Sequence, residues 1–456
     1  MARGATHVLG LDIGTQTIKV VELRLSGQDV VLVGQPAIVP TPTGSVVGGR
    51  VVDEEAVSQA LMQAVSEHRF GVKKVVASVG GDTDVVVRIA EMPRMEAREL
   101  DEAVQWELDR QTPFPIDQVI YDFQPVEHPG ADPASPNMEV FLAVAQEDMV
   151  NAHAETMMTS KMIPIAIDVE PLALGRALVE LGGDAVMQST AVVVHIGHTH
   201  ALICIFCQGV PVFTRTIPTA GEAFTAAIRQ RLGLSELDAD RAKRHFADVS
   251  DVIPYDDYDD HGLDDDDSGG MLAAGDDSIF EVSDADSSVD ADMSLDSTDD
   301  IATHVDVDTQ AYELPPETPT PDETAVHAPT ADDQADGPAD AADPLTEDER
   351  LASEHVSDAL VDSITELATE LQRSIQHYRR QHRRENISTI ILSGGTASMR
   401  GLPEFITAET GVPTQVANPF SNIRTNPTHV SDAYLRDVGP AVSIAVGLAL
   451  RDILDR

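Results

Sequence analysis

The residues with the clearest chemical potential lie in the stretch LGLDIGTQTIKVVEL, from Leu9 to Leu23. Two apolar runs flank a polar turn, which predicts a β-hairpin with its turn at residues 14–17. The polar set is Asp12, Gly14, Thr15, Gln16, Thr17 and Lys19. Gly14 permits a turn whose N–H groups converge, while Lys19 adds a cation and Asp12 could hold a metal through water. Such a set suits a polyphosphate with Mg²⁺, although an ordinary hairpin with a polar turn has the same spacing.

A second stretch, from Thr190 to Ile217, repeats this plan. A strand runs into Gly197, polar residues follow, and two more apolar strands complete the pattern. Two such hairpins facing one another would clamp a phosphate chain from both sides. The only cysteines, Cys204 and Cys207, lie in this stretch. Their side chains point to opposite faces of a strand, which disfavours a shared metal and makes both core residues.

The elements around the first hairpin predict a mixed α/β fold. Three strands at residues 8–39, a helix at 53–69 and two further strands give a β-β-β-α-β start. Residues 85–162 then form a small α+β unit. Its amphipathic helix presents Leu100, Ala103, Val104 and Leu108 on one side and ends before Pro113-Phe114-Pro115. We expect Trp106, the only tryptophan, to pack in the core of this unit.

The second half of the chain contains two helices separated by Gly233 and a long helix that ends near residue 381. A buried strand, the Gly394-Gly395 turn and a further helix come next, and an apolar helix closes the chain. No stretch approaches the roughly 20 apolar residues needed to cross a bilayer, and the N-terminus lacks the apolar run of a signal peptide. We therefore expect a cytoplasmic protein without direct membrane insertion.

The formal net charge of −48 is concentrated in one segment. Residues 248–349 contain 34 Asp and Glu and no Lys or Arg, and they are poor in aromatic residues. This composition predicts disorder. The remaining 354 residues carry 44 acidic and 30 basic side chains, a charge of −14, which disfavours nucleic-acid binding. The segment is interpreted as a solvated spacer; the alternative is a docking tail for a basic partner or, given its many Ser and Thr, a phosphorylated regulator.

In order along the chain, these features resemble the PilM family of type IV pilus assembly proteins, within the FtsA-related actin-like (ribonuclease H-like) ATPase fold. The resemblance covers residues 6–248 and 350–456 and is carried by LDIGTQTIKVVEL, ELDEAVQWELDRQTPFPIDQVIYDF, AIDVEPLALGRAL and AVSIAVGLALR. It implies two lobes with a small α+β insert. The expected parts are a first subdomain at 1–84 and 163–190, the insert at 85–162, a second lobe at 191–247 and 350–456, and the disordered insertion at 248–349.

The resemblance also implies a site for ATP and Mg²⁺ between the lobes. In the first hairpin, Asp12 is the implied metal-binding residue. The resemblance also assigns to the nucleotide Gly197, His198, Thr199 and His200 of the second loop, and Ala220, Gly221 and Glu222 at a helix start. Asp240 and Lys243 are expected near the ribose and adenine, and Gly394, Gly395 and Thr396 form the adenosine motif. A helix N-terminus suits an anionic phosphate.

The chain departs from the family pattern at two places. The second loop usually begins Asp-x-Gly, and here it begins with His195; the usual Gly-Gly before the next helix is Ala220-Gly221. Because neutral imidazole positions a metal or an attacking water less well than a carboxylate does, we expect ATP hydrolysis to be weak or absent. A metal cluster of His195, His198 and His200 is a minor alternative, since it needs the strand to continue past Gly197.

The implied partner is the N-terminal cytoplasmic peptide of PilN, through which the protein would join the PilN/PilO inner-membrane complex of the pilus machinery. We expect the peptide groove beside the small insert, with Val86 and Ile89 as candidates. Two other functions remain open. A sugar or acid kinase of the same superfold would need a carboxylate base that the His195 loop lacks. An FtsA-like cell-division ATPase would need a membrane-targeting helix beyond the last core helix.

Overall fold

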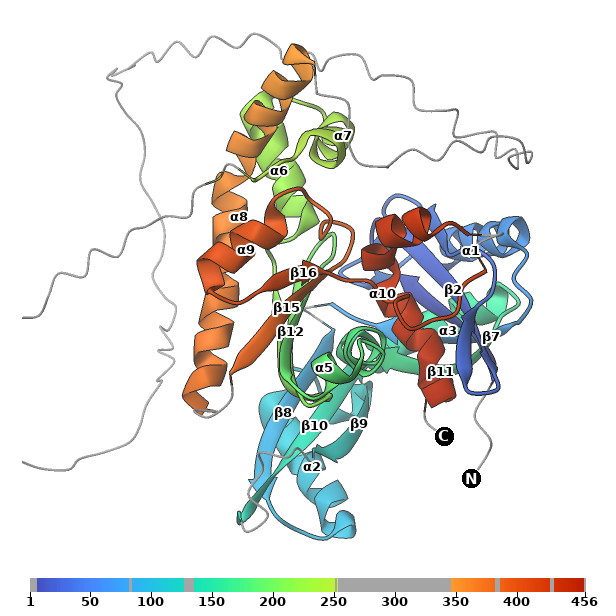
Figure 1. Ribbon diagram of the computed structural model, residues 1–456. Helices are drawn as coiled ribbons and strands as arrows, with labels where there is room; N and C mark the ends of the chain where they lie inside the picture. Colours follow the sequence, from blue (N-terminus) through green and yellow to red (C-terminus); the bar gives the residue numbers. More distant parts are fainter. Residues whose placement is uncertain are drawn as a thin grey trace, which may run out of the picture. The chain divides into compact units, whose positions relative to one another are not determined.

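The computed structural model describes residues 6–81, 84–126, 135–250, 252, 346–381, 386–426 and 430–454. These residues form two lobes, each built on its own β-sheet, and a small insert (Figure 1). Most of the acidic segment, for which disorder was predicted, lies outside the described residues. Across the described ranges, every helix is too short or too polar to traverse a lipid bilayer.

Lobe 1 is built on a sheet in the order β3-β2-β1-β7-β11. Its strands are β1 (His7–Ile13), β2 (Thr17–Ser26), β3 (Asp29–Leu32), β7 (Lys74–Val79) and β11 (Ile163–Val169), with β4 (Ala37–Pro40) paired to β2. The first three strands are antiparallel neighbours, whereas β7 and β11 run parallel to β1. A small hairpin of β5 (Val46–Val47) and β6 (Arg50–Val51) follows β4.

Lobe 2 repeats this topology. Its sheet has the order β14-β13-β12-β15-β16. The strands are β12 (Thr190–Ile196), β13 (Ala201–Cys207), β14 (Val210–Ile217), β15 (Ile387–Ser393) and β16 (Thr414–Val416). Again the first three are antiparallel and the last two parallel. The internal repeat predicted from the two hairpins is therefore confirmed, and so is the α/β actin-like fold class with its duplicated ribonuclease H-like sheet.

The helices form layers on both sheets. Lobe 1 carries α1 (Glu54–His68) and α3 (Glu147–Thr159), which pack together on one face of its sheet. The outer face of lobe 2 carries α6 (Gly221–Leu232), α7 (Glu236–Phe246), α8 (Glu347–Gln381) and α9 (Leu402–Thr410). Between the two sheets lie α4 (Glu170–Leu174), a π-helical turn (Gly175–Glu180), the short α5 (Asp184–Met187) and α10 (Asp432–Leu454). This middle layer joins both lobes into one apolar core.

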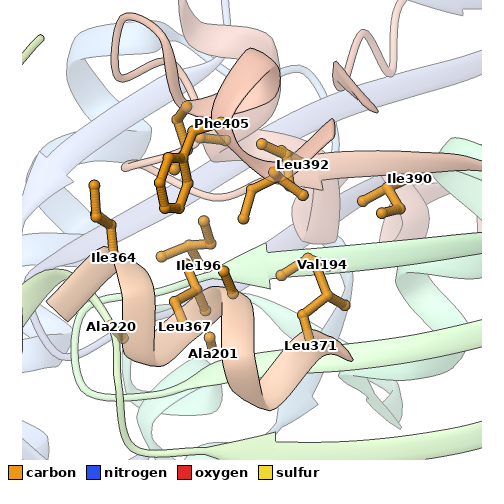
Figure 2. Packing of buried hydrophobic residues seen from close by; sticks show 14 of the residues in the cluster. Val194, Ile196, Ala201, Ala220, Ile364, Leu367, Leu371, Ile390, Leu392 and Phe405 are labelled. Atoms are coloured by element: carbon orange, nitrogen blue, oxygen red, sulfur yellow. The ribbon is translucent and has the colours of Figure 1, made fainter. Parts of the chain in front are cut away.

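Successive side chains of β12 point to opposite faces of the lobe 2 sheet and pack in two different cores. Val194 and Ile196 point to the outer helices and pack near Leu367 and Phe405 (Figure 2). Val193, one residue along, packs in the middle layer instead. The cysteines follow the same rule: Cys204 lies in the middle core and Cys207 in the outer core, as predicted. A strand buried on both faces explains why this stretch reads as a continuous apolar run.

Helix α10 approaches its neighbours closely because glycine faces backbone at two crossings. A Cβ on Gly10 would lie 1.8 Å from the carbonyl oxygen of Ala445, and a Cβ on Gly447 would lie 1.8 Å from that of Ala173. No side chain fits at either place, so α10 packs directly on β1 and on α4. These contacts make α10 the element that holds lobe 1 against the middle layer.

The small insert is a three-stranded sheet in the order β8-β10-β9, with α2 (Ala97–Gln111) on one face. Its strands are β8 (Val85–Pro93), β9 (Val119–Val126) and β10 (Asn137–Gln146), and a 3-10 turn (Ile116–Gln118) precedes β9. Leu100, Val104 and Leu108 pack beneath α2, as the helical spacing predicts. The expectation for Trp106 is wrong: its side chain is 76% exposed, since it lies on the face of α2 opposite to Val104.

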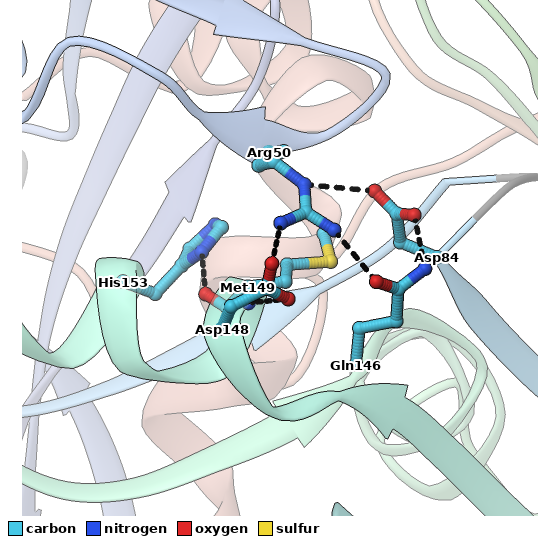
Figure 3. A network of polar contacts seen from close by, with 6 residues as sticks. All are labelled: Arg50, Asp84, Gln146, Asp148, Met149 and His153. Carbon is cyan, nitrogen blue, oxygen red and sulfur yellow. Dashed lines mark hydrogen bonds and ion pairs between the residues drawn. The ribbon is translucent and has the colours of Figure 1, made fainter. Parts of the chain in front are cut away.

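A polar network fixes the insert to lobe 1. The guanidinium of Arg50, on β6, donates to Asp84 Oδ2 at 3.0 Å, Asp148 Oδ2 at 2.5 Å and Gln146 Oε1 at 3.1 Å (Figure 3). Hydrogen bonding from Arg50 lowers the pKa of Asp148. On the other side, Thr214 Oγ1 of β14 donates to the carbonyl oxygen of Val87 at 2.8 Å. The insert is therefore attached to both lobes.

Two expected boundaries differ from the structure. Helix α3, expected within an insert at 85–162, packs against α1 and buries Met157 in the lobe 1 core. The acidic segment was expected to begin at 248 and end at 349, yet Val249 is buried in lobe 2 and α8 begins at Glu347. Both edges of that segment belong to lobe 2, because local packing there overrides the acidic composition.

Candidate functional site

A cavity of about 320 Å³ lies where the two hairpins face one another. This volume is at the lower end of the range of about 300–1,000 Å³ typical of small-molecule sites. The predicted residues that line the cavity are Asp12, Gly14, Thr15, Gln16, Thr17, Lys19, Gly197, His198, Thr199, His200, Gly221, Asp240, Lys243, Gly395 and Thr396. Ala220, Glu222 and Gly394 are not among the lining residues. The fold thus brings together residues from both lobes that are far apart in sequence.

The first hairpin turns as predicted. Glycine is required at position 14 because a side chain would not fit there, and not because of a positive φ. Its φ is not positive, whereas a Cβ there would lie 2.9 Å from the carbonyl oxygen of Thr17. The Gly14 N–H donates to that oxygen at 3.1 Å and so closes the turn. Lys19 Nζ lies 3.1 Å from Asp12 Oδ2, and both side chains are largely buried. Thr41 braces the loop by donating through Oγ1 to the carbonyl oxygen of Gly14 at 2.7 Å.

The second hairpin has the same closure. The Gly197 N–H donates to the carbonyl oxygen of His200 at 3.1 Å, and β12 ends at Ile196, before the glycine. The strand therefore does not continue through His198 to His200. Within the described part of the chain, no group of three or more His, Cys, Asp or Glu suits a metal ion, so the minor alternative of a histidine metal cluster is wrong there.

The helix α6 braces this loop with the N–H groups that were expected to approach a phosphate. The N–H of Gly221 donates to the carbonyl oxygen of Gly197 at 3.1 Å, and that of Glu222 donates to His198 at 2.7 Å. Since both donors are engaged, Glu222 and its neighbour hold the second loop in place. Gly221 also lines the cavity. A side chain there would crowd the second loop, since a Cβ would lie 3.0 Å from the carbonyl oxygen of Gly197.

The two glycines that follow β15 have different roles. Gly394 has φ +96° and packs on backbone: a Cβ there would lie 2.1 Å from the carbonyl oxygen of Ile196. Gly395 faces open space, with nothing within 4 Å of an added Cβ, and it lines the cavity with Thr396. Of this pair, only Gly395 is placed to approach a ligand, so the assignment of Gly394 to ligand contact is not supported by its position.

Asp240 and Lys243 of α7 form a buried polar pair at another wall of the cavity. Lys243 Nζ donates to the carbonyl oxygen of Gly221 at 2.9 Å and to Thr225 Oγ1 at 2.7 Å, and it lies 3.1 Å from Asp240 Oδ1. Burial lowers the pKa of Lys243. Burial alone would raise the pKa of Asp240, but the charges of Lys243 and Arg244 lower it overall. Lys243 is thus held by protein contacts that join α6 to α7.

His195 is buried at the end of β12, and burial lowers its pKa from 6.5 to about 4. Its ring is therefore neutral near pH 7. Its Nδ1 lies 3.1 Å from Ser393 Oγ, and Ser393 in turn donates to the carbonyl oxygen of Pro440 at 3.2 Å. His198, also in the cavity wall, has its pKa lowered by burial.

Sequence reasoning missed several lining residues, of which Glu170 has the most chemistry. It begins α4 directly after β11, and its Oε2 lies 3.5 Å from His200 Nε2. Desolvation alone would raise the pKa of Glu170, but the hydrogen bond from His200 and nearby cationic groups lower it overall. Ser78, Gly80 and His153 also line the cavity. The detectable signal was position: Glu170 follows the carboxyl end of a parallel strand, where ligand sites form in α/β sheets.

Comparisons with known proteins agree with this fold. A model of the family described as type IV pilus assembly protein PilM matches residues 10–250 and 332–453. Among solved structures, a PilM-PilN type IV pilus biogenesis complex is 22% identical, covers 98% of both chains and has a TM-score of 0.68. The ethanolamine utilization protein EutJ from Carboxydothermus hydrogenoformans is 12% identical, with 98% and 90% coverage and a TM-score of 0.47. MreB5 of Spiroplasma citri bound to ADP is 12% identical, with 99% and 97% coverage and a TM-score of 0.45.

The family match extends over both lobes and includes both hairpins, α6, α7 and α10. It leaves out residues 251–331. The likeness to the PilM-PilN complex establishes a shared fold over nearly the whole chain. This chain therefore belongs to the PilM family of type IV pilus assembly proteins.

Proposed function

We propose that this protein is an ATP-binding scaffold of the type IV pilus machinery, located in the cytoplasm and attached to the inner membrane through partners. The observation that carries the nucleotide part is the cavity itself, because the duplicated fold gathers the predicted polar residues of two hairpins around one space. Lys19 supplies a buried cation, and the open face of Gly395 leaves room for a flat ring.

The polar groups of the cavity suit a magnesium nucleotide. Asp12 offers a carboxylate on the first hairpin, and Mg²⁺ is commonly held by one or two carboxylates together with phosphate oxygens. Asp240 Oδ1 is buried, and its one close partner among the described residues is Lys243 Nζ, at 3.1 Å. A ribose hydroxyl would satisfy that oxygen. Titration with a fluorescent ATP analogue tests the site, and Lys19→Ala should weaken binding.

The proposed partner is the N-terminal cytoplasmic peptide of PilN, and through it the PilN/PilO complex. The solved PilM-PilN complex shares this fold. The groove residues expected from sequence are poor candidates, because Val86 packs beneath α2 and Ile89 packs against the core of lobe 2. Along β8, Thr214 also occupies the carbonyl oxygen of Val87.

The opposite edge of the insert offers a better docking strand. Within the described residues β9 pairs only with β10, so its other edge is open to an added strand. Ile120 on this strand is 44% exposed and Asp122 is exposed beside it. An extended peptide with an apolar and a basic side chain would complement this edge.

A matched pair of variants tests the docking strand. Ile120→Asp should abolish binding of the PilN peptide in a pull-down, whereas Leu237→Asp should not, because Leu237 is an exposed apolar residue on α7 of lobe 2. Hydrogen exchange with the peptide should show protection centred on β9. Equal loss of binding in both variants, or protection confined to lobe 2, would contradict the assignment.

Turnover of ATP by this site should be slow. Neutral His195 stands at the second loop, and the buried carboxylate of Glu170 is paired with His200. A phosphate-release rate on the order of 10 per second, typical of an efficient enzyme, would contradict slow turnover. Membership of the PilM family also places the FtsA-like alternative second.

A further inference from the structure

The second hairpin presents an imidazole where the first presents a carboxylate. In the first, Asp12 is opposite Lys19 and lies two residues before the glycine that closes the turn. In the second, His195 is opposite Leu202 and lies two residues before Gly197. Both turn glycines donate their N–H at 3.1 Å to the residue three positions later. The two side chains therefore hold equivalent positions on the two hairpins, and both line the cavity.

Ser393 bears on the tautomer of His195. Its hydroxyl group donates to the carbonyl oxygen of Pro440 at 3.2 Å, and in that arrangement its oxygen accepts from the imidazole at 3.1 Å. The proton of the neutral ring is thereby assigned to Nδ1 from the hydrogen-bond network, and Nε2 keeps a lone pair. Since Nδ1 lies against Ser393, Nε2 is the ring nitrogen available to a ligand in the cavity that His195 lines.

A lone pair beside bound phosphates needs a cation or a hydrogen-bond donor between them, because phosphate oxygens are acceptors too. Each of the nearby basic groups faces a carboxylate: Lys19 lies 3.1 Å from Asp12, and His200 lies 3.5 Å from Glu170. A divalent cation that arrives with the phosphates would bridge the imidazole and the phosphate oxygens. Imidazole nitrogen binds first-row transition ions, Mn²⁺ the most weakly among them, whereas Mg²⁺ takes oxygen ligands.

We propose that His195 Nε2 ligates the divalent cation that accompanies a bound nucleoside polyphosphate, so that this site prefers a transition ion such as Mn²⁺ to Mg²⁺. The inference rests on the proposed nucleotide site. Since the described residues contain no metal cluster of their own, the cation is held jointly by the imidazole and the phosphate oxygens. Mn²⁺ alone should consequently bind weakly in the absence of nucleotide.

Pulsed electron paramagnetic resonance tests the ligand directly. The full chain with Mn²⁺ and a non-hydrolysable ATP analogue should show nitrogen modulation of the spin echo. Labelling the protein's histidines with ¹⁵N should shift the modulation frequency, which assigns it to imidazole. His195→Gln should remove the signal. A signal that persists in this variant, or that is absent from the wild-type complex, would overturn the proposal.

Nucleotide affinity provides a second measurement, made at equal free concentrations of Mn²⁺ and Mg²⁺. His195→Asp should reduce the preference for Mn²⁺ by on the order of tenfold, as expected when a metal ligand changes type. Ser393→Ala keeps the imidazole but removes the hydrogen-bond partner of its Nδ1. This variant should reduce the preference for Mn²⁺ by less than His195→Asp does. Equal affinity with both ions in the wild type would reject the metal preference and leave the nucleotide site standing. Failure of any nucleotide to bind would reject both.

Discussion

Asp12 and His195 occupy the same place in two copies of one hairpin, two residues before a glycine whose N–H closes the turn at 3.1 Å. The duplication thus preserves backbone geometry while the chemistry of the two copies differs. One side chain pairs with a lysine, and the other with a serine that leads to the backbone of α10. The predictions below test what each environment does.

The adjacent glycines after β15 should respond differently to substitution. Gly395→Val places its side chain in open cavity space, so it should block nucleotide binding while the melting temperature stays close to wild type. Gly394→Val must avoid the backbone of Ile196 and a φ of +96°, so it should lower the melting temperature by several degrees. Thermal melts and nucleotide titration of both variants provide the measurements. Binding that survives in Gly395→Val would contradict the site.

Substitution of the two lysines of the cavity should have different effects on nucleotide affinity and on stability. Lys19→Ala removes a charge-assisted contact to ligand, which corresponds to about 1.5–3 kcal/mol of binding free energy. Lys243 instead bonds to Gly221 and Thr225 and pairs with Asp240, all within the protein. Lys243→Ala should therefore lower the free energy of unfolding as well as nucleotide affinity. Denaturant titration distinguishes the two; an unchanged stability in Lys243→Ala would argue against its bracing role.

Stability should fall as the pH drops from about 6.5 to about 4. Burial holds the pKa of His195 near 4, so over this window the unfolded chain binds a proton that the folded chain does not. The difference from the ordinary value corresponds to about 3 kcal/mol at most. His195→Gln removes this contribution and should flatten the pH dependence of the unfolding free energy in that window. The lowered pKa of buried His153 acts in the same direction and remains in both proteins. Identical slopes for the two would refute the prediction.

The stability of a protein from which the acidic segment has been excised should depend on the exact residues at which the segment is cut. Ser357 Oγ donates to the carbonyl oxygen of Asp248 at 2.5 Å, and Ser353 Oγ donates to that of Phe246 at 2.8 Å, so the two ends are held together on α8. Replacing residues 253–345 with a short Gly-Ser linker should leave the melting temperature nearly unchanged.

Excision at the boundaries read from composition, 248 and 349, is the matched control. It removes Val249, which is buried in lobe 2, and the first turn of α8, so it should cost roughly 2 kcal/mol or more. Comparison of the two deletions by thermal melting checks the argument. Equal stability of the two would mean that the contacts of residues 248–250 contribute nothing.

Much of this architecture could be predicted from sequence because it rests on local patterns. The repeat of two strand-turn-strand motifs specified the duplicated sheet, and the spacing of Leu100, Val104 and Leu108 specified the buried side of α2. The residues of the cavity could be assigned because they lie at strand ends and turns. Their meeting in space followed from the resemblance, not from any single motif.

Apart from Trp106, which lies on the exposed face of its own helix, the differences concern contacts between elements distant in sequence. The packing of Val86 beneath α2 and of Ile89 against lobe 2 could not be read from the sequence, because nothing in β8 indicates which elements lie beside it. The N–H groups at the start of α6 looked free for phosphate, yet the second loop accepts from them. Glu170 was overlooked because its pairing with His200 joins residues thirty positions apart on different lobes.

The attachment of the insert to both lobes has an energetic consequence. Arg50 joins it to lobe 1 and the bond from Thr214 to Val87 joins it to lobe 2, so a change in the angle between the lobes must strain one connection or tilt β8. A nucleotide that favours one angle between the lobes then changes the affinity of the insert for its peptide. A peptide bound to the insert changes the affinity for the nucleotide by the same factor. Such coupling is reciprocal by thermodynamic necessity. Thr214→Val deletes one connection and neither binding surface, and because Ile89 still packs against lobe 2, it should weaken the influence of nucleotide and peptide on each other's affinity.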